Sequence, residues 1–268
     1  MRNILAVFIT ISFFVGCTTN AVTGRKQLVL FPESTLQAEA LTQYQSFLST
    51  NKVVSSTGNK DAEMVRRVGS RIASAIEAYY ANNPTVSADL KTYKWEFNLV
   101  DSKEVNAWCM PGGKVVVYTG LLPITQNEAA LAVVLGHEIT HAIAHHGNER
   151  MSQVTIAQGL EVAGDFFTRN KQQANSIFNN VFAPAAQVGV LLPNSRNQEY
   201  EADHYGLLFC AMAGYNPKEA IPFWQRMSAA GGSSKPPEFL ATHPSDANRI
   251  DRLEGYMDEA LSVYKPVK

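Results

Sequence analysis

The sequence predicts an α+β domain that is rich in helix and has a small mixed sheet. Hydrophobic residues make up 46% of the 268 residues and charged residues 18%, which is typical of a globular chain with a substantial core. Apolar residues recur at helical spacing in several segments, whereas two short segments carry the patterns of strands. No repeat or internal linker interrupts these patterns in the sequence, so a single domain is the simplest interpretation.

Local patterns predict the individual elements in order. Apolar residues on one side of residues 35–48 and 61–80 predict two helices. Residues 93–100 alternate between apolar and polar side chains, as a half-buried strand does, and β-branched residues over 114–119 predict a second strand. Helical patterns predict the remaining helices over residues 125–147, 151–180, 195–213, 217–229 and 244–264.

Specific signals mark the ends of the two helices that matter most. Thr125 and Ser195 each open a capping box, and Gly147 is the expected end of the first of these helices. The segment 151–194 lies between the two helices and contains several Gly and Ala residues. We expect this segment to form a movable lid or plug over a cleft, with a plain pair of packing helices as the alternative.

The N-terminus has the pattern of a secretory signal. One basic residue precedes the apolar run 4–15, which is too short to span a membrane comfortably. The Val-Gly-Cys sequence that ends at Cys17 resembles a bacterial lipobox, and this resemblance implies cleavage before Cys17 and lipid on that residue. An ordinary signal peptide is the alternative. Because Thr18 replaces the Asp of inner-membrane lipoproteins, we expect anchoring at the periplasmic face of the outer membrane.

The expected domain organisation follows from this signal. Residues 1–16 form a lipoprotein-type signal peptide, residues 17–34 a lipidated tether with a short docked part at 27–31, and residues 35–268 the functional domain. The membrane is therefore contacted through the lipid anchor alone.

A formal net charge of −1 argues against nucleic acid as a partner, because dedicated phosphate binders carry a basic excess.

The chemistry is concentrated on two of the predicted helices. The first contains HEITH at residues 137–141, so His137 and His141 lie one turn apart on one face and can reach the same ion. Glu138 borders that face and is the expected general base, because it can reach a water held by the ion. Two surface histidines are the alternative, but this helix is otherwise apolar, and burying these groups without a metal would be costly. We therefore predict one zinc ion per chain.

The second helix supplies the expected third ligand. Glu199 and Asp203 are four residues apart on one face, so Glu199 can bind zinc while Asp203 accepts a hydrogen bond from a ligand histidine. A solvated helix carboxylate is the alternative for Glu199. We expect His145 and His146 to lie in solvent near the end of the first helix.

These motifs together resemble the HtpX and CAAX prenyl protease family of gluzincin metallopeptidases. The resemblance rests on residues 137–141, on SRxxExxAD at 195–203, and on THP at 242–244 followed by Arg249. Residues 23–28 and 106–113 are similar to its soluble periplasmic lipoprotein branch. The resemblance implies a zincin-like metallopeptidase fold with a small mixed sheet beside the HEITH helix. It also implies the zinc ligands His137, His141 and Glu199, the base Glu138 and the supporting Asp203.

The resemblance also implies roles for residues around the cleft. Asn106 and Ala107 look like the edge-strand segment that holds the substrate backbone; a strand-end Asn is the alternative. His243 can stabilise the oxyanion of the reaction, or bind zinc and keep the enzyme latent, unless it only caps a helix. Arg249 can bind a substrate carbonyl or anchor the loop before it. Cys109 and Cys210 form either a disulfide, in an oxidising compartment, or two buried free thiols.

Three hypotheses about function follow. The first is a lipid-anchored zinc endopeptidase that faces the periplasm and cleaves misfolded or misassembled envelope proteins. The second is a chaperone or assembly factor for envelope proteins whose protease site is plugged and rarely used. The third, zinc storage, predicts several weak metal sites instead of one tight site per chain.

Overall fold

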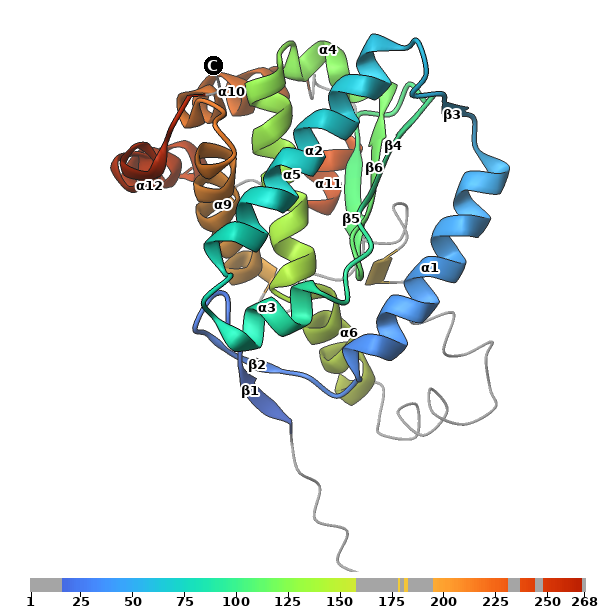
Figure 1. Ribbon diagram of the computed structural model, residues 1–268, viewed down its shortest axis with the longest axis vertical. Helices are drawn as coiled ribbons and strands as arrows, with labels where there is room; N and C mark the ends of the chain where they lie inside the picture. The colour runs from blue at the N-terminus through green and yellow to red at the C-terminus, as the bar shows by residue number, and fades with distance from the viewer. Residues whose placement is uncertain are drawn as a thin grey trace, which may run out of the picture.

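A four-stranded mixed sheet separates two layers of helices in the computed structural model (Figure 1). The structure describes residues 16–157, 178, 181–182, 195–230, 237–243 and 248–266. The strands follow the order β3 (Val53–Val54), β4 (Glu96–Val100), β6 (Lys114–Tyr118) and β5 (Ala107–Met110). Only β4 and β6 are parallel, so the predicted helix-rich α+β class with a small mixed sheet is confirmed.

Strand β6 lies at the centre of the domain because both of its faces are apolar. Val115 and Val117 point into the larger core, whereas Val116 and Tyr118 point into a second core on the opposite face. The alternation of side chains along a strand explains how one β-branched run can serve both cores. Periodicity did not indicate strand β5, whereas the family resemblance implied an edge-strand segment at Asn106 and Ala107; within the described part of the chain β5 pairs with β6 alone and forms an edge of the sheet.

Helices cover both faces of this sheet. Helix α1 (Glu33–Thr50) covers one face, and α2 (Lys60–Tyr79) and α5 (Glu128–Ile143) cover the other (Figure 1). Beyond α5 lie α9 (Ser195–Met212) and α12 (Arg249–Val263). The shorter helices are α3 (Pro84–Leu90), η1 (Thr119–Leu121), α4 (Leu122–Thr125), α6 (His146–Ala157), η3 (Pro217–Glu219), α10 (Ala220–Ala230) and α11 (Glu238–Thr242).

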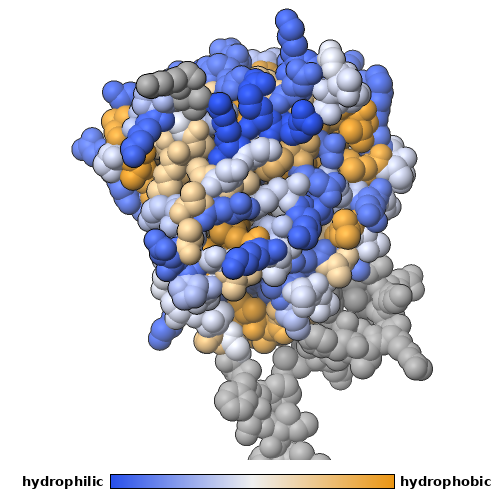
Figure 2. All heavy atoms as spheres, viewed as in Figure 1, coloured by the Kyte–Doolittle hydropathy of each residue, from blue (hydrophilic) through white to orange (hydrophobic). Residues whose placement is uncertain are grey.

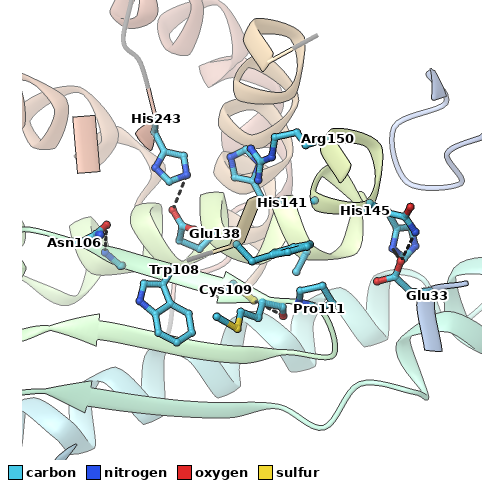
Figure 3. A pocket seen from close by; sticks show the side chains of 16 residues that line it. Glu33, Asn106, Trp108, Cys109, Pro111, Glu138, His141, His145, Arg150 and His243 are labelled. Atoms are coloured by element: carbon cyan, nitrogen blue, oxygen red, sulfur yellow. Dashed lines mark hydrogen bonds and ion pairs between the residues drawn. The ribbon is translucent and has the colours of Figure 1, made fainter. Parts of the chain in front are cut away.

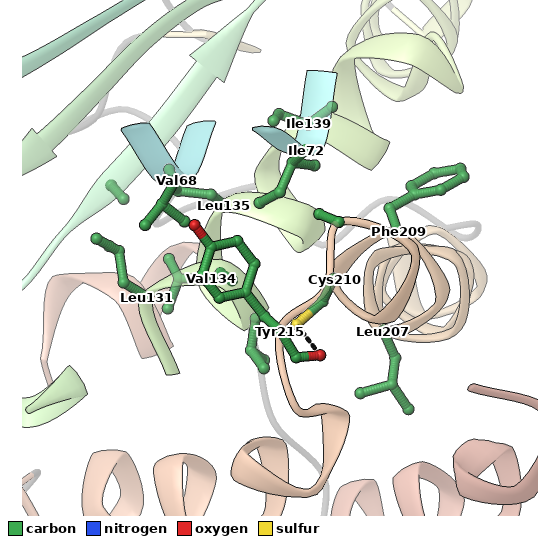
Figure 4. Close-up of a cluster of buried hydrophobic side chains, with 14 of the residues drawn as sticks. Val68, Ile72, Leu131, Val134, Leu135, Ile139, Leu207, Phe209, Cys210 and Tyr215 are labelled. Carbon is green, nitrogen blue, oxygen red and sulfur yellow. Dashed lines mark hydrogen bonds between the residues drawn. The ribbon is translucent and has the colours of Figure 1, made fainter. Parts of the chain in front are cut away.

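The larger core joins α2, α5 and α9. Ile72 of α2, Leu135 of α5 and Phe209 of α9 belong to one cluster, labelled in Figure 4, and all three side chains are fully buried. Burying each such side chain stabilises the fold by roughly 1.5–3 kcal/mol. Helix α5 is buried along its whole length from Ala130 to Ile143 and is therefore the central element of the domain.

Both predicted ends of α5 are wrong. The N-cap is Asn127, whose side chain accepts a hydrogen bond from the Ala130 N–H at 2.8 Å, while Thr125 ends the preceding short helix. The helix ends at Ile143 rather than at Gly147. His145 adopts a left-handed conformation with φ of 53°, which reverses the chain and starts α6 at the next residue.

Helices α5 and α9 approach each other at two glycines. A Cβ atom on Gly136 would lie 2.4 Å from the Gly206 carbonyl oxygen, and one on Gly206 would lie 2.7 Å from the His137 nitrogen. Both separations are shorter than van der Waals contact allows, so neither glycine can be replaced without moving a helix. The contact sets how far Glu199 and Asp203 of α9 lie from His137.

The N-terminal segment docks onto the lower end of the domain over more of its length than expected. Strands β1 (Cys17–Thr19) and β2 (Lys26–Leu28) form a hairpin. The Asn20 side chain donates to the Ala144 carbonyl oxygen at 2.9 Å, so it satisfies an acceptor at the end of α5. Residues 1–15 of the expected signal peptide lie outside the described residues.

The surface carries no concentrated apolar patch on the face drawn in Figure 2, where polar and apolar side chains are interspersed. Among the described residues, the exposed large apolar side chains come from separate elements and are Leu41, Val53, Tyr79 and Ile156. Among the residues that the structure describes, no helix is long and apolar enough to cross a membrane.

The glycine contact can be tested by substitution. We expect Gly206→Ala to lower the free energy of unfolding by about 1–3 kcal/mol, because the added methyl group forces α9 away from α5. The same displacement should weaken zinc binding. Urea unfolding and a competition assay with a chromogenic chelator measure the two effects.

Gly255→Ala is the matched control for this substitution. Gly255 lies in the middle of α12, and no atom lies within 4 Å of the position that a Cβ atom would take there, so alanine should stabilise the helix by up to about 1 kcal/mol. Equal stability and equal zinc affinity of Gly206→Ala and the wild type would contradict the role given to the contact.

Candidate metal centre and active site

Three side chains from α5 and α9 converge on one point. The Nε2 atoms of His137 and His141 are 3.1 Å apart, and the Glu199 carboxylate lies 3.4 Å from each of them. All three residues are buried. His243 adds a fourth potential ligand atom, and the four atoms, one from each residue, all lie within 4.8 Å of one another. The i, i+4 spacing on α5 and the close approach of α9 produce this cluster.

The donor set fits zinc. Ligand atoms at about 2.0–2.2 Å from a tetrahedral zinc ion are themselves about 3.3–3.6 Å apart, which is close to these separations. Glu199 Oε2 is buried without a hydrogen bond among the described residues, as expected of an atom reserved for a metal. Two imidazoles and a carboxylate are a common ligand set of catalytic zinc sites.

A second carboxylate of α9 orients His137. Asp203 Oδ1 lies 3.0 Å from His137 Nδ1, so the carboxylate accepts the Nδ1 proton and leaves Nε2 free to bind a metal. The Arg249 guanidinium donates to the same oxygen at 2.6 Å. Burial opposes the charge on Asp203, but Arg249 and His137 outweigh it and hold the pKa of the carboxyl below its ordinary value.

The structure places Arg249 behind the metal centre rather than in the cleft. Its guanidinium is buried over the Trp224 ring, 3.5 Å from the ring centroid, and another of its nitrogens lies 3.5 Å from the His243 carbonyl oxygen. This position agrees with the alternative that Arg249 anchors the loop at His243, and the contact with a substrate carbonyl stays a prediction.

His146 is not solvated, contrary to the sequence prediction, and His145 is only partly exposed. His146 is fully buried; its Nδ1 lies 2.9 Å from His141 Nδ1 and its Nε2 lies 2.9 Å from a Glu201 oxygen. His145 pairs with Glu33 at 3.1 Å and with Asp89. Burial opposes the charge on His145, but these two carboxylates outweigh it and raise its pKa to about 10.

Glu138 faces the cleft beside the metal ligands. Its Oε1 lies 3.5 Å from His243 Nε2, and Figure 3 shows the two side chains directed toward each other. Burial raises the pKa of Glu138 to about 8, whereas burial lowers the pKa of His243 to about 3. Burial thus disfavours the charged form of each of these two side chains.

The cleft itself lies between α5, β5 and α6. Asn106 and Ala107 line it at the start of the edge strand, as expected of a segment that receives a peptide backbone. The Asn106 side chain accepts the Ala107 N–H at 2.9 Å and is buried. Arg150 of α6 also lines the cleft, near His141 in Figure 3, and no sequence motif indicated it.

The expected lid segment, 151–194, is described only in part: residues 151–157 belong to α6, and three further residues are described. Phe178, Val181 and Phe182 are buried in the second core, and Phe182 lines the cleft. The remaining residues of 158–194 lie outside the described ones.

Cys109 and Cys210 are not bridged, so the disulfide alternative is corrected in favour of two free thiols. Cys109 lines the cleft together with Glu138, whereas the Cys210 thiol lies 4.0 Å from the Ala129 carbonyl oxygen. Glu138 and Ala129 are about 13 Å apart along α5 at 1.5 Å per residue. The two thiols thus lie beside different parts of α5, and both are free.

Comparison with known proteins identifies the family. The model of peptidase family M48 matches residues 59–257, which is most of the chain. The chain therefore belongs to peptidase family M48, and the predicted family of zinc metallopeptidases is confirmed.

Similar curated proteins come from mitochondria and from bacteria. The mitochondrial metalloendopeptidase OMA1 of Schizosaccharomyces pombe is 36% identical over 169 residues, which are 62% of this chain and 48% of that protein. Human mitochondrial metalloendopeptidase OMA1 is 28% identical over 260 residues, 94% of this chain and 48% of that protein. The beta-barrel assembly-enhancing protease of Yersinia pestis is 30% identical over 174 residues, 63% and 36% of the two chains. The chain thus spans about half the length of these relatives or less.

The contact between Asp203 and His137 predicts a change in metal affinity. In Asp203→Asn, the amide can donate to His137 Nδ1 and favour the tautomer whose Nε2 carries a proton. We expect zinc affinity to fall about 10- to 100-fold, measured by competition with a chromogenic chelator. Glu138→Gln is the control and should bind zinc as the wild type does. Unchanged affinity in Asp203→Asn would refute the assignment.

Proposed function

We propose that this protein is a zinc-dependent endopeptidase that is lipid-anchored at Cys17, faces the periplasm from the bacterial outer membrane, and cleaves misfolded or misassembled envelope proteins. The observation that carries the catalytic part is the position of Glu138. Its carboxylate is buried beside the ligand cluster and opens onto a cleft bordered by an edge strand. A base next to a metal site and a strand edge are what peptide hydrolysis requires.

The metal site, Glu138 and His243 have different roles in the proposed reaction. A zinc ion held by His137, His141 and Glu199 would supply a water whose pKa is lowered to about 7 and would polarise the scissile carbonyl. Glu138 Oε1 has no hydrogen bond among the described residues, so it can accept the proton of the attacking water and return it to the leaving amine. His243, 3.5 Å from Glu138, is placed to hydrogen-bond the oxyanion that forms at the substrate carbonyl.

The proposed substrate class follows from the edge strand. Main-chain groups of β5 beside α5 can pair with an extended peptide, and such pairing reads the backbone rather than a sequence motif. Unfolded or misassembled proteins expose such segments. The name of the Yersinia pestis relative, a beta-barrel assembly-enhancing protease, agrees with an envelope role.

The catalytic part is tested with a matched pair of variants. We expect the wild type to cleave casein and to lose this activity on chelation. Glu138→Gln should lower the rate by 10²- to 10⁴-fold while one zinc remains bound per chain, because it removes the base and no ligand. Glu128→Gln is the control, since Glu128 begins the same helix and only pairs with the exposed Arg67 at the surface. Equal activity of the two variants would exclude Glu138 as the base.

The second candidate is a chaperone or assembly factor whose site is rarely used. His243 favours it, because its imidazole belongs to the cluster of donors and can fill a coordination position that the substrate needs. His243→Ala separates the two functions. If both the wild type and His243→Ala bind unfolded proteins without cleaving them, the second candidate is supported. Binding of more than one zinc ion per chain would instead support zinc storage.

The proposed location is tested at Cys17. We expect the wild type to fractionate with outer membranes and Cys17→Ser to appear in the soluble periplasmic fraction, because the serine cannot carry the thioether-linked lipid. Palmitate labelling of the wild type alone would accompany this shift. A Cys17→Ser variant that stays with the membrane would show that another feature holds the protein there.

A further inference from the structure

A chain of polar contacts connects the N-terminal hairpin to the metal centre. Arg25 lies just before β2 and forms ion pairs with two carboxylates, Glu149 of α6 and Glu201 of α9. Glu201 in turn contacts His146, and His146 contacts the metal ligand His141. The hairpin therefore reaches the ligand through three side chains, and Figure 1 places it beside α6 at the lower end of the domain.

The tautomers along this chain are fixed by the role of His141. A ligand that binds metal through Nε2 carries its proton on Nδ1, and this proton is donated to His146 Nδ1 at 2.9 Å. His146 then carries its own proton on Nε2 and donates it to Glu201 Oε2, also at 2.9 Å. Each donor thus has one acceptor in sequence, and the Glu201 carboxylate is the final acceptor.

Arg25 fixes that carboxylate in place. Its Nε donates to Glu201 Oε1 at 2.6 Å, and its Nη1 and Nη2 donate to the two oxygens of Glu149 at 2.7 and 2.6 Å. The Glu149 side chain is only 1% exposed, so removal of Arg25 would leave a buried carboxylate with less compensation for its charge. Glu149 also accepts a hydrogen bond from Gln198, the neighbour of the ligand Glu199.

We propose that Arg25 is a positioning residue of the metal centre, which acts through Glu201 and His146 to hold His141 in the orientation and tautomer that bind zinc. The docked N-terminal hairpin is therefore part of the metal site. Docking of the hairpin and binding of zinc favour each other, and the coupling acts equally in both directions. This inference does not depend on which polypeptides the protein cleaves.

The first experiment measures zinc affinity without any substrate. We expect Arg25→Gln to bind zinc about tenfold more weakly than the wild type in competition with a chromogenic chelator. Glu201→Gln should show a similar loss, and Arg25→Gln should add less than twofold in a Glu201→Gln background, because both act through one chain. Arg67→Gln is the matched control, since it removes only a surface ion pair with α5, and it should keep full affinity.

A purely structural role of Arg25 gives a different result. It would lower the midpoint of thermal unfolding in Arg25→Gln and leave the zinc affinity of the folded protein unchanged, which would overturn the proposal. An undiminished effect of Arg25→Gln in the Glu201→Gln background would do the same. If Arg25→Gln does not fold, Arg25→Lys keeps the charge without the two-sided fork of donors and should retain intermediate affinity.

The second experiment measures the reverse direction of the coupling. Hydrogen exchange of residues 17–28 is compared in wild-type protein with and without zinc, and in Arg25→Gln under the same conditions. We expect zinc to slow exchange in this hairpin in the wild type and not in Arg25→Gln. Asn20→Ala should retain the zinc-dependent slowing, because Asn20 docks the hairpin through Ala144 and not through the ion pairs. Exchange that is independent of zinc in the wild type would overturn the coupling, whatever the result of the casein assay.

Discussion

Helices α5 and α9 approach each other so closely at Gly136 and Gly206 that neither position has room for a methyl group. This approach sets the distance between the histidines of one helix and the acidic residues of the other. Glu199 and Asp203 lie one turn apart on α9, so one reaches the Nε2 side of His137 and the other reaches its Nδ1 side. The metal centre is thus a property of a helix pair, and its geometry depends on two residues that have no side chain.

Helix α9 supplies three carboxylates with three tasks. Glu199 is a candidate metal ligand, Asp203 lies behind His137, and Glu201 lies behind His146, which contacts His141. Each ligand histidine is therefore oriented by an acidic residue, directly on one side and through another imidazole on the other. Each supporting carboxylate is paired with an arginine, which offsets the cost of burying its charge.

Sequence periodicity was enough to predict those site residues and elements that depend only on spacing along one helix or strand. The spacing of His137 and His141, the i, i+4 pair on α9 and the apolar run of β6 all follow from local geometry. Residues joined only by the folded chain could not be found in this way. His146 returns to His141 because His145 adopts a left-handed conformation, and Arg25 meets Glu149 and Glu201 across more than a hundred residues. Edge strand β5 lacks the alternation of a half-buried strand, since three of its four residues are buried.

The edge strand at the cleft determines which property of a substrate decides whether it can bind. A strand edge pairs only with a backbone that has given up its own hydrogen bonds, so a native protein must first open locally before it fits. When opening and closing are fast, the rate of cleavage follows the equilibrium population of the open segment. Under the proposed function, the protease would therefore select its substrates by their local stability. A destabilisation of about 1.4 kcal/mol in a client would raise its cleavage about tenfold with no change in its sequence at the cut site.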